Sequence, residues 1–250
     1  MSSRALAVRA AVLAVAVSTV APVASAQSTG DGFLFRRPVG TFTLRGGYDR
    51  AIAGSDYFGD VTERLTLSRG SFAAPTVGAD VALRIRDRFD LSISGAFARA
   101  HQTSEYRRFL GTDDLPLDQR TTFTRVPVTA TVKYYLTPRG EQVGRFAWIP
   151  ARLAPFVAAG AGGVYYHLRQ NGWVLNEETL VARVADLQSS GWAGAVLGAA
   201  GADVSISPRF LLTTEARYTR ARAPLSNSFV GFEPLDLSGL ALTAGLAVRF

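Results

Sequence analysis

The final segment of the chain, residues 240–250, alternates between two faces without interruption. A period of two is the repeat of a β-strand, because successive side chains of a strand point to opposite sides. One face carries Leu240, Leu242, Ala244, Leu246, Val248 and Phe250. The opposite face carries Ala241, Thr243, Gly245, Ala247 and Arg249. This segment therefore predicts a strand with one apolar face.

Seven earlier segments show the same alternation. The connectors at 86–88 and 207–209 are short enough to be tight hairpin turns. Folding about the first turn places Ile85 opposite Phe89 and Arg84 opposite Asp90, so apolar side chains meet each other and opposite charges meet. The predicted strands are 41–48, 76–85, 89–99, 126–136, 156–168, 192–206, 210–218 and the closing 240–250.

The remaining connectors differ in length between the two ends of the strands. Long polar connectors lie at the end opposite the two tight turns, at 50–75, 100–125, 169–191 and 221–238. Short periplasmic turns and long extracellular loops are typical of outer-membrane barrels. The connector 137–153 is long although it falls at the turn end. We expect its Trp148 to lie near the membrane boundary as an anchor.

The first residues of the chain have the layout of a secretory signal. Arg4 and Arg9 precede an apolar run at 10–20, and small residues at 24–26 offer a cleavage site before Gln27. No later segment reaches the roughly 18 uninterrupted apolar residues that a transmembrane helix needs. We expect a cleaved signal peptide at 1–26, a short N-terminal segment at 27–38 and a barrel at 39–250.

Composition narrows the functional classes. The net charge is +7, and Lys133 is the only lysine, so the basic excess consists of arginine. These arginines are scattered rather than clustered with aromatic residues, which disfavours nucleic-acid binding and suits lipopolysaccharide phosphates or loop carboxylates. Cysteine is absent, which excludes a disulfide framework. The loop carboxylates Asp113, Asp114 and Asp118 match no calcium-loop spacing, and no metal or cofactor is predicted.

The orientation of the apolar faces separates a membrane barrel from a soluble one. A soluble barrel turns its apolar face inward, whereas a membrane barrel turns it toward lipid. Aromatic residues near strand ends, such as Tyr48, Tyr134, Trp192 and Tyr218, favour lipid because aromatic girdles lie at membrane interfaces. Charges on the opposite faces must then pair with one another inside the barrel. They are Asp80, Arg84, Asp90, Lys133, Glu215, Arg217 and Arg249.

Taken together, these features resemble the small eight-stranded outer-membrane barrels, such as the transmembrane domain of outer membrane protein A. The closing strand fits the insertion signature of that class through Thr243, Gly245, Val248 and Phe250. The resemblance implies an all-β, eight-stranded antiparallel up-and-down transmembrane barrel in the bacterial outer membrane, in contact with lipid and lipopolysaccharide. It also implies assembly by the barrel-assembly machinery through the closing strand, and a monomer. Because the chain ends at Phe250, we do not carry over the peptidoglycan-binding domain.

The lumen of an eight-stranded barrel is just wide enough to be filled by side chains. We therefore expect a plugged, charge-paired lumen and a non-enzymatic protein, contributing to envelope integrity or to loop-mediated adhesion or ligand contact. A narrow small-solute channel is the first alternative and would need a gap in the charge network. The second is a lipid A-modifying enzyme using His101 with Ser104 and Glu105. Strand parity sends His101 outward and His167 inward, so the two histidines are not expected to converge.

The side-chain pattern also predicts features of the loops and of the fifth strand. Apolar stripes predict short helices at 57–65 and at 176–187, both packed on the barrel rim. Asn171 and Gly172 suggest a turn just beyond the fifth strand. In that strand we expect Val164, Tyr166 and Leu168 to face lipid, with Tyr165 and His167 inside.

Overall fold

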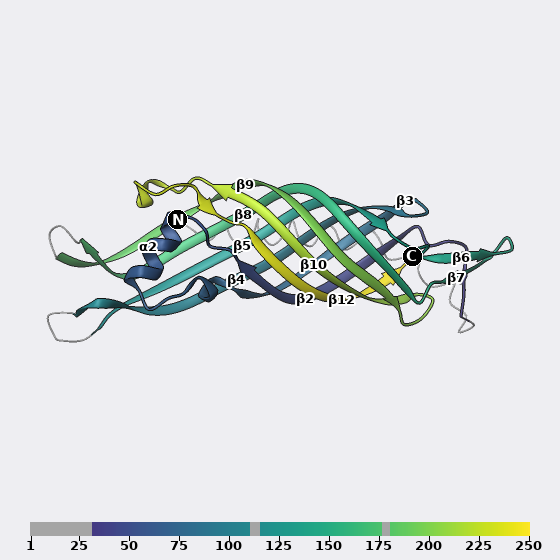
Figure 1. Cartoon of the computed structure of the whole chain (residues 1–250), viewed down its shortest axis with the longest axis horizontal. Helices are drawn as coiled ribbons and strands as arrows, with labels where there is room; N and C mark the ends of the chain where they lie inside the picture. The colour runs from purple at the N-terminus through teal and green to yellow at the C-terminus, as the bar shows by residue number, and fades with distance from the viewer. Residues whose placement is uncertain (1–31, 111–115, 177–180) are drawn as a thin grey trace, which may run out of the picture.

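The computed structural model describes residues 32–110, 116–176 and 181–250, so the predicted signal peptide and Asp113 and Asp114 lie outside the described residues. Long antiparallel strands form a closed ring of eight, in which the last strand pairs with the first (Figure 1). The predicted up-and-down barrel is confirmed. Its strands are β2 (Gly40–Ala51), β3 (Ala74–Arg86), β4 (Phe89–Leu110), β5 (Pro116–Tyr135), β8 (Leu153–Asn176), β9 (Val181–Ser205), β10 (Phe210–Ala223) and β12 (Gly239–Arg249).

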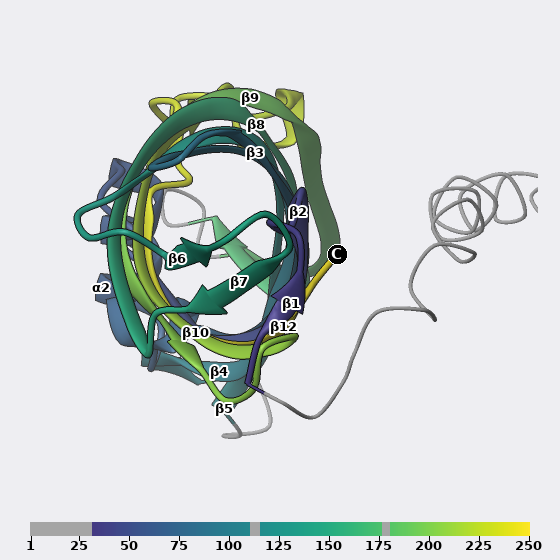
Figure 2. The same cartoon turned by 90° about the vertical axis from the view of Figure 1, so that its right-hand side faces the viewer.

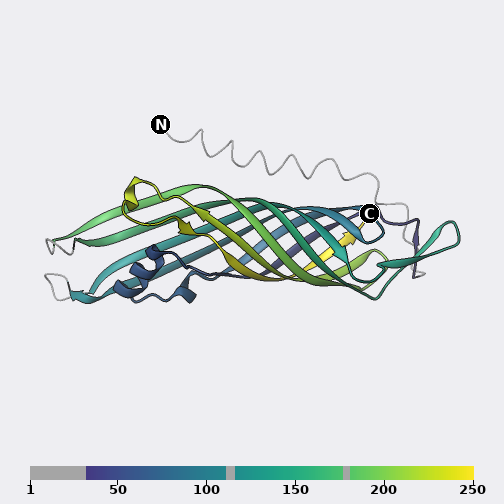
Figure 3. The ribbon, with the colours of Figure 1, turned by 45° about the horizontal axis from the view of Figure 1, so that its top comes forward.

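The ring closes with an offset that fixes the inclination of its strands. Following paired residues once around the barrel from Thr41 leads back to β2 at Ala51, ten residues beyond the start. The circuit passes Ala82, Ser92, Thr131, Gly160, Leu197, Thr219 and Gly239. With about 4.8 Å between strands and about 3.3 Å per residue, this offset inclines the strands by about 40° to the barrel axis. Figure 3 shows the inclination from a second side.

The two tight hairpins largely keep their predicted register. Arg84 pairs with Asp90 across the first turn, and Leu212 pairs with Val204 across the second. The predicted pairing of Ile85 with Phe89 is wrong, because a register shift after Arg84 brings Arg86 opposite Phe89. Such a bulge places two residues of one strand against one of its partner.

Two of the predicted loops are mostly strand. β4 continues to Leu110 and β5 begins at Pro116, while β8 continues to Asn176 and β9 begins at Val181. These four strands project beyond the rest of the barrel at one end (Figure 1). The helix predicted at 176–187 is therefore wrong, since 181–187 belong to β9. The turn predicted at Asn171 and Gly172 is also wrong, because both residues pair with β5 and β9, Gly172 with a φ of +134°.

The helix predicted in the first loop is confirmed as α2 (Asp56–Arg64), which is followed by the 3-10 helix η1 (Arg69–Phe72). The fourth loop contributes a second 3-10 helix, η2 (Asn227–Phe229), and β11 (Leu235–Asp236), which pairs with β10. The apolar side chains of these segments pack against the inner faces of β5, β8, β9 and β10. We call this arrangement the outer cap. No helix among the described residues is long and apolar enough to cross a membrane.

At the other end of the barrel, a small three-stranded sheet lies across the opening (Figure 2). It consists of β1 (Leu34–Phe35), β7 (Ala147–Pro150) and β6 (Gly140–Val143). By the polarity of outer-membrane barrels, this end with the short turns faces the periplasm. Trp148 of β7 is buried, so the prediction that it anchors the chain at the membrane boundary is wrong.

Candidate functional site

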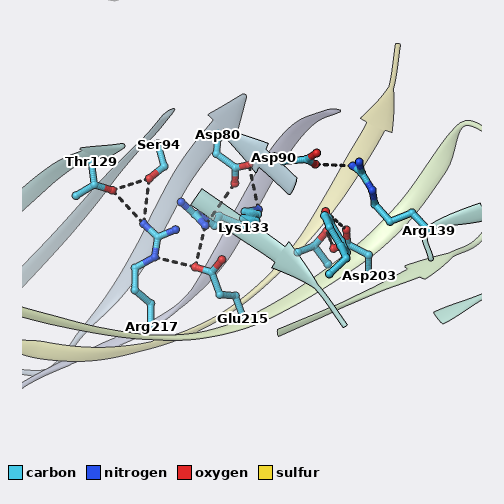
Figure 4. A network of polar contacts seen from close by, with 12 residues as sticks. Asp80, Asp90, Ser94, Thr129, Lys133, Arg139, Asp203, Glu215 and Arg217 are labelled. Atoms are coloured by element: carbon cyan, nitrogen blue, oxygen red, sulfur yellow. Dashed lines mark hydrogen bonds and ion pairs between the residues drawn. The ribbon is translucent and has the colours of Figure 1, made fainter. Parts of the chain in front are cut away.

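Oppositely charged side chains from four strands meet in the middle of the lumen. Arg45 Nη1 of β2 lies 3.4 Å from Asp80 Oδ1 of β3 and 3.2 Å from Glu215 Oε1 of β10. Lys133 Nζ of β5 lies 3.7 Å from Asp80 Oδ2, and Arg217 Nε lies 2.7 Å from Glu215 Oε1. Figure 4 shows Asp80, Lys133, Glu215 and Arg217 facing one another inside the barrel. We call these four residues and Arg45 the central cluster.

Two hydroxyl groups extend the central cluster toward β4 and β5. Arg217 Nη1 donates to Ser94 Oγ at 3.0 Å, and Ser94 Oγ lies 2.9 Å from Thr129 Oγ1 (Figure 4). Ser94 and Thr129 are buried, as are the carboxylates of the cluster. Buried charges are costly unless each finds an opposite charge and hydrogen bonds. The inward faces of these strands provide both, so the lumen is filled by paired side chains.

A second polar layer closes the periplasmic half of the lumen. Arg139 Nη1 donates to Asp90 Oδ2 at 2.6 Å, and its guanidinium lies 4.5 Å from the centre of the Tyr135 ring. The Tyr135 hydroxyl and Thr213 Oγ1 both donate to the carboxylate of Asp203, at 2.9 and 2.8 Å. These two hydroxyl groups satisfy both oxygens of Asp203 with hydrogen bonds, as a buried carboxylate requires.

The Trp148 ring covers the periplasmic end of this layer. The guanidinium groups of Arg84 and Arg249 lie 5.7 and 5.4 Å from its centre. Arg249 Nη2 also donates to Ser205 Oγ at 2.7 Å, which ties β12 to β9. Cations favour the face of a tryptophan ring, so the indole is held by the two arginines rather than by lipid.

The extracellular half of the lumen is closed by the outer cap. Arg125 Nη2 pairs with Asp49 Oδ2 at 3.1 Å, and above this pair the interior becomes apolar. The Phe58 ring packs edge-on against Phe72 and Phe123, with ring centres 4.7 and 5.6 Å apart. On α2, burial raises the pKa of the Tyr57 phenol well above its ordinary value, so this group stays neutral. The outer cap therefore seals the barrel with a hydrophobic core.

Spaces of different size remain between and beside these layers. A cavity of about 50 Å³ lies between the central cluster and the Arg125–Asp49 pair, room for a few water molecules only. A cleft of about 170 Å³ opens at the outer cap between α2 and η2, and we call it the outer cleft. Its lining includes Tyr57, Val61, Gln119, Phe229 and Phe232. The Tyr57 hydroxyl has no hydrogen-bond partner within the described residues.

The charges predicted to face inward divide between two of these layers. Asp80, Lys133, Glu215 and Arg217 meet in the central cluster. The other three, Arg84, Asp90 and Arg249, lie in the periplasmic layer and contact different partners. The prediction did not include Arg45, Arg139, Asp203, Arg125 or Asp49. Of these, Arg45 lies on a predicted inward face, whereas Arg139 lies in a connector without alternation.

The residues of the insertion signature lie on both faces of β12. Thr243 and Gly245 lie on the inner face, and Val248 and Phe250 on the outer face. The Phe250 carbonyl accepts hydrogen bonds from the backbone N–H groups of Val39 and Gly40, which joins β12 to the start of β2.

The face predicted for the fifth strand is wrong. Val164, Tyr166 and Leu168 are buried inside the barrel, and the Tyr166 hydroxyl donates to the Pro224 carbonyl at 2.6 Å. Tyr165 and His167 consequently lie on the outer face; the Tyr165 ring packs against that of Trp192, with centres 5.6 Å apart.

The residues considered for catalysis do not converge. His101 faces outward, where its Nδ1 lies 2.9 Å from Thr122 Oγ1. Ser104 is buried on the inner face of the same strand and donates to the Gln119 carbonyl at 3.2 Å. His101 and Ser104 therefore lie on opposite faces of the sheet. No group of metal-ligating side chains is found among residues 32–110, 116–176 and 181–250.

The outer surface of the barrel is apolar along the strands that carry the central cluster. Leu44, Val77 and Val132 expose 58, 62 and 45% of their surface, whereas Asp80 and Glu215 expose 2 and 5%. Water-soluble proteins do not expose a continuous apolar belt over a charged interior, whereas this arrangement is required in lipid. The chain is an outer-membrane β-barrel.

No protein-family model matches this barrel, and no curated protein matches it in sequence. Among solved structures it is similar to Neisserial surface protein A, with 11% identity, a TM-score of 0.42, and coverage of 84% of this chain and 97% of that one. It is similar to the attachment invasion locus protein of Yersinia pestis, with 12% identity, a TM-score of 0.39, and coverage of 85% and 99%. It is also similar to outer membrane protein W of Escherichia coli, with 13% identity, a TM-score of 0.37, and coverage of 86% and 100%.

Proposed function

We propose that this barrel is sealed and non-enzymatic, and that its function lies at the extracellular end. The observation that carries the proposal is the closure of the lumen at three levels. The outer cap, the central cluster and the periplasmic layer each fill the cross-section with packed or paired side chains. A barrel closed in this way can contact other molecules through the surface outside the membrane, where β4, β5, β8 and β9 project.

The projecting strands and the outer cap together support contact with a ligand or with a neighbouring surface. Loops and rims carried by a rigid scaffold are where binding residues concentrate. The outer cleft, at about 170 Å³, is close in size to engineered cavities of about 150 Å³ that bind benzene. Its lining combines the aromatic side chains of Phe229 and Phe232 with the amides of Gln119 and Gln170. Ligand contact is therefore favoured over a purely structural contribution to the envelope.

The seal makes a direct prediction about conductance. Purified protein, refolded in detergent and added to a planar lipid bilayer, should produce no discrete openings, because no continuous aqueous path crosses the central cluster. The variant Phe58→Ala, which opens only the outer cap, should be equally silent. A porin measured under the same conditions provides the positive control, and reproducible openings of constant size in the intact protein would refute the seal.

The role of the projecting strands can be tested by shortening them. Gln102 pairs with Thr121, so residues 103–120 can be replaced by a two-residue Asn-Gly turn at that pair. The shortened protein should still shift its gel mobility on boiling, as folded barrels do, while losing the contact function. Binding of protein-bearing cells to host cells or matrix, compared with cells that carry the full-length chain, reports that loss. Unchanged binding together with increased leakage of a bulky antibiotic would instead assign the barrel to envelope integrity.

A further inference from the structure

Three barrel strands carry the same outward pair of residues at the extracellular edge of the apolar belt. In β2, β4 and β10, an exposed aromatic residue is followed two positions later, on the same face and nearer the outside, by an exposed arginine. The pairs are Tyr48 with Arg50, Phe97 with Arg99 and Tyr218 with Arg220. The three strands alternate with β12 and β3 around the ring.

The barrel offset brings these pairs to one height. An offset of ten residues over eight strands raises the paired register by about 1.25 residues per strand, or about 2.5 residues over two strands. Tyr218 pairs with Leu240, whose partner on β2 is Arg50. The paired register rises by about 2.5 residues from β10 to β2, so the residue of β2 at the same height as Tyr218 lies about 2.5 residues before Arg50, close to Tyr48. Phe97 pairs with Val77, whose partner on β2 is Gly46. From β4 to β2 the paired register falls by about 2.5 residues, so the position level with Phe97 lies about 2.5 residues after Gly46, again close to Tyr48. The aromatic rings therefore share one level, and the arginines share the next.

The three arginine side chains differ from the cations inside the lumen in having no partner within the described part of the chain. Arg45, Arg125, Arg139 and Arg217 pair with carboxylates inside the lumen, and the exposed Arg169 pairs with Asp186 at 2.7 Å. The side chains of Arg50, Arg99 and Arg220 have neither a hydrogen bond nor an ion pair with any described residue. An unpaired guanidinium just outside an apolar belt is placed to meet an anionic headgroup.

We propose that Arg50, Arg99 and Arg220 form a collar that binds the phosphate groups of lipopolysaccharide in the outer leaflet. Guanidinium groups match phosphate oxygens with paired hydrogen bonds, and the aromatic residues below them set the depth of the barrel at the interface. Arginines on alternate inclined strands stand about 12 Å apart, so that neighbours reach different phosphate groups. The collar depends on the membrane placement of the barrel and not on the proposed contact at the outer cleft.

The collar can be tested by measuring how purified lipopolysaccharide binds to protein refolded in neutral detergent. The change in tryptophan fluorescence on addition of the lipid gives the binding affinity. The variant with Arg50→Gln, Arg99→Gln and Arg220→Gln should bind about a hundredfold more weakly, because each exposed arginine near an anionic lipid surface contributes about fivefold. A matched variant at the periplasmic end, with Arg86→Gln, Arg88→Gln and Arg152→Gln, removes the same charge from exposed positions and should bind like the intact protein.

Dephosphorylated lipopolysaccharide serves as the second probe. The intact protein should bind it about as weakly as the collar variant binds the phosphorylated form, and added salt should weaken only the phosphate-dependent binding. Equal binding of the intact protein to both lipids would overturn the proposal, as would equal loss in the periplasmic variant. The comparison of lipids uses the intact protein, so it decides the question even if the collar variant fails to fold.

Discussion

The variant Glu215→Ala is expected to lower the free energy of unfolding of the barrel by about 3–5 kcal/mol. The carboxylate of Glu215 lies between the guanidinium groups of Arg45 and Arg217, at 3.2 and 2.7 Å, and all three side chains are largely shielded from water. Removing it leaves the three cations of the central cluster with a single carboxylate, Asp80, and desolvated charge without a partner is strongly unfavourable. Equilibrium unfolding of the refolded protein in urea, followed by gel mobility, measures the loss.

The control for this prediction is Glu233→Ala, which removes the same group from an exposed position in the fourth loop. Its effect should lie within about 0.5 kcal/mol of zero, as is usual for surface substitutions. The double variant Glu215→Met with Arg217→Met should recover part of the loss, because it removes the pair together. If Glu215→Ala and Glu233→Ala unfold at the same urea concentration, the central cluster does not stabilise the barrel.

The second large effect is expected from Phe58→Ala, which should destabilise the outer cap by about 3–5 kcal/mol. The Phe58 side chain is completely buried, and its ring packs against Phe72 and Phe123. Truncation leaves a cavity in the apolar core that holds α2 inside the barrel mouth. The loss should be local, because the strands below are joined by their own ladder of hydrogen bonds. Faster hydrogen exchange in 56–72, with unchanged exchange in β2 and β12, is the expected signature.

Val230→Ala is the matched control for the outer cap, because Val230 belongs to the fourth loop but exposes 83% of its surface. Hydrogen exchange in 56–72 should be unchanged in this variant. Faster exchange throughout the barrel in Phe58→Ala would show instead that the outer cap and the strands unfold together, contrary to the local model.

The strands could be predicted because the side chains that face lipid differ in polarity from those that face the lumen. In β3, β5 and β10, apolar outward residues alternate with charged inward ones, so both strand and face could be predicted from the sequence. In β8 that contrast is lost. Residues 158–163 are all alanine or glycine, and farther along the strand the interior becomes apolar because it packs against the outer cap. An apolar side chain there no longer indicates lipid, which is why Val164, Tyr166 and Leu168 were predicted on the wrong face.

The candidate site could be predicted only in part, for a related reason. Asp80, Lys133, Glu215 and Arg217 lie at inward positions of strands with clear alternation, and they meet in the central cluster. Arg139 and Trp148 lie in a connector whose path across the opening depends on pairing between β6, β7 and β1. The projecting ends of β4 and β9 carry polar residues on both faces, since both are outside lipid, and this removes the pattern that reveals a strand.

The closure of the barrel limits where insertions and deletions can occur in the chain. Deleting one residue from a strand would move every following side chain to the other face, which would put arginines and carboxylates into the acyl chains and leucines against ions. An open sheet could accommodate the shift in register at an edge strand, but a closed barrel has no edge strand. Inherited changes of length should therefore be confined to the connectors outside the bilayer, so that relatives of this chain vary in their exposed tips while conserving the number of residues that cross the membrane.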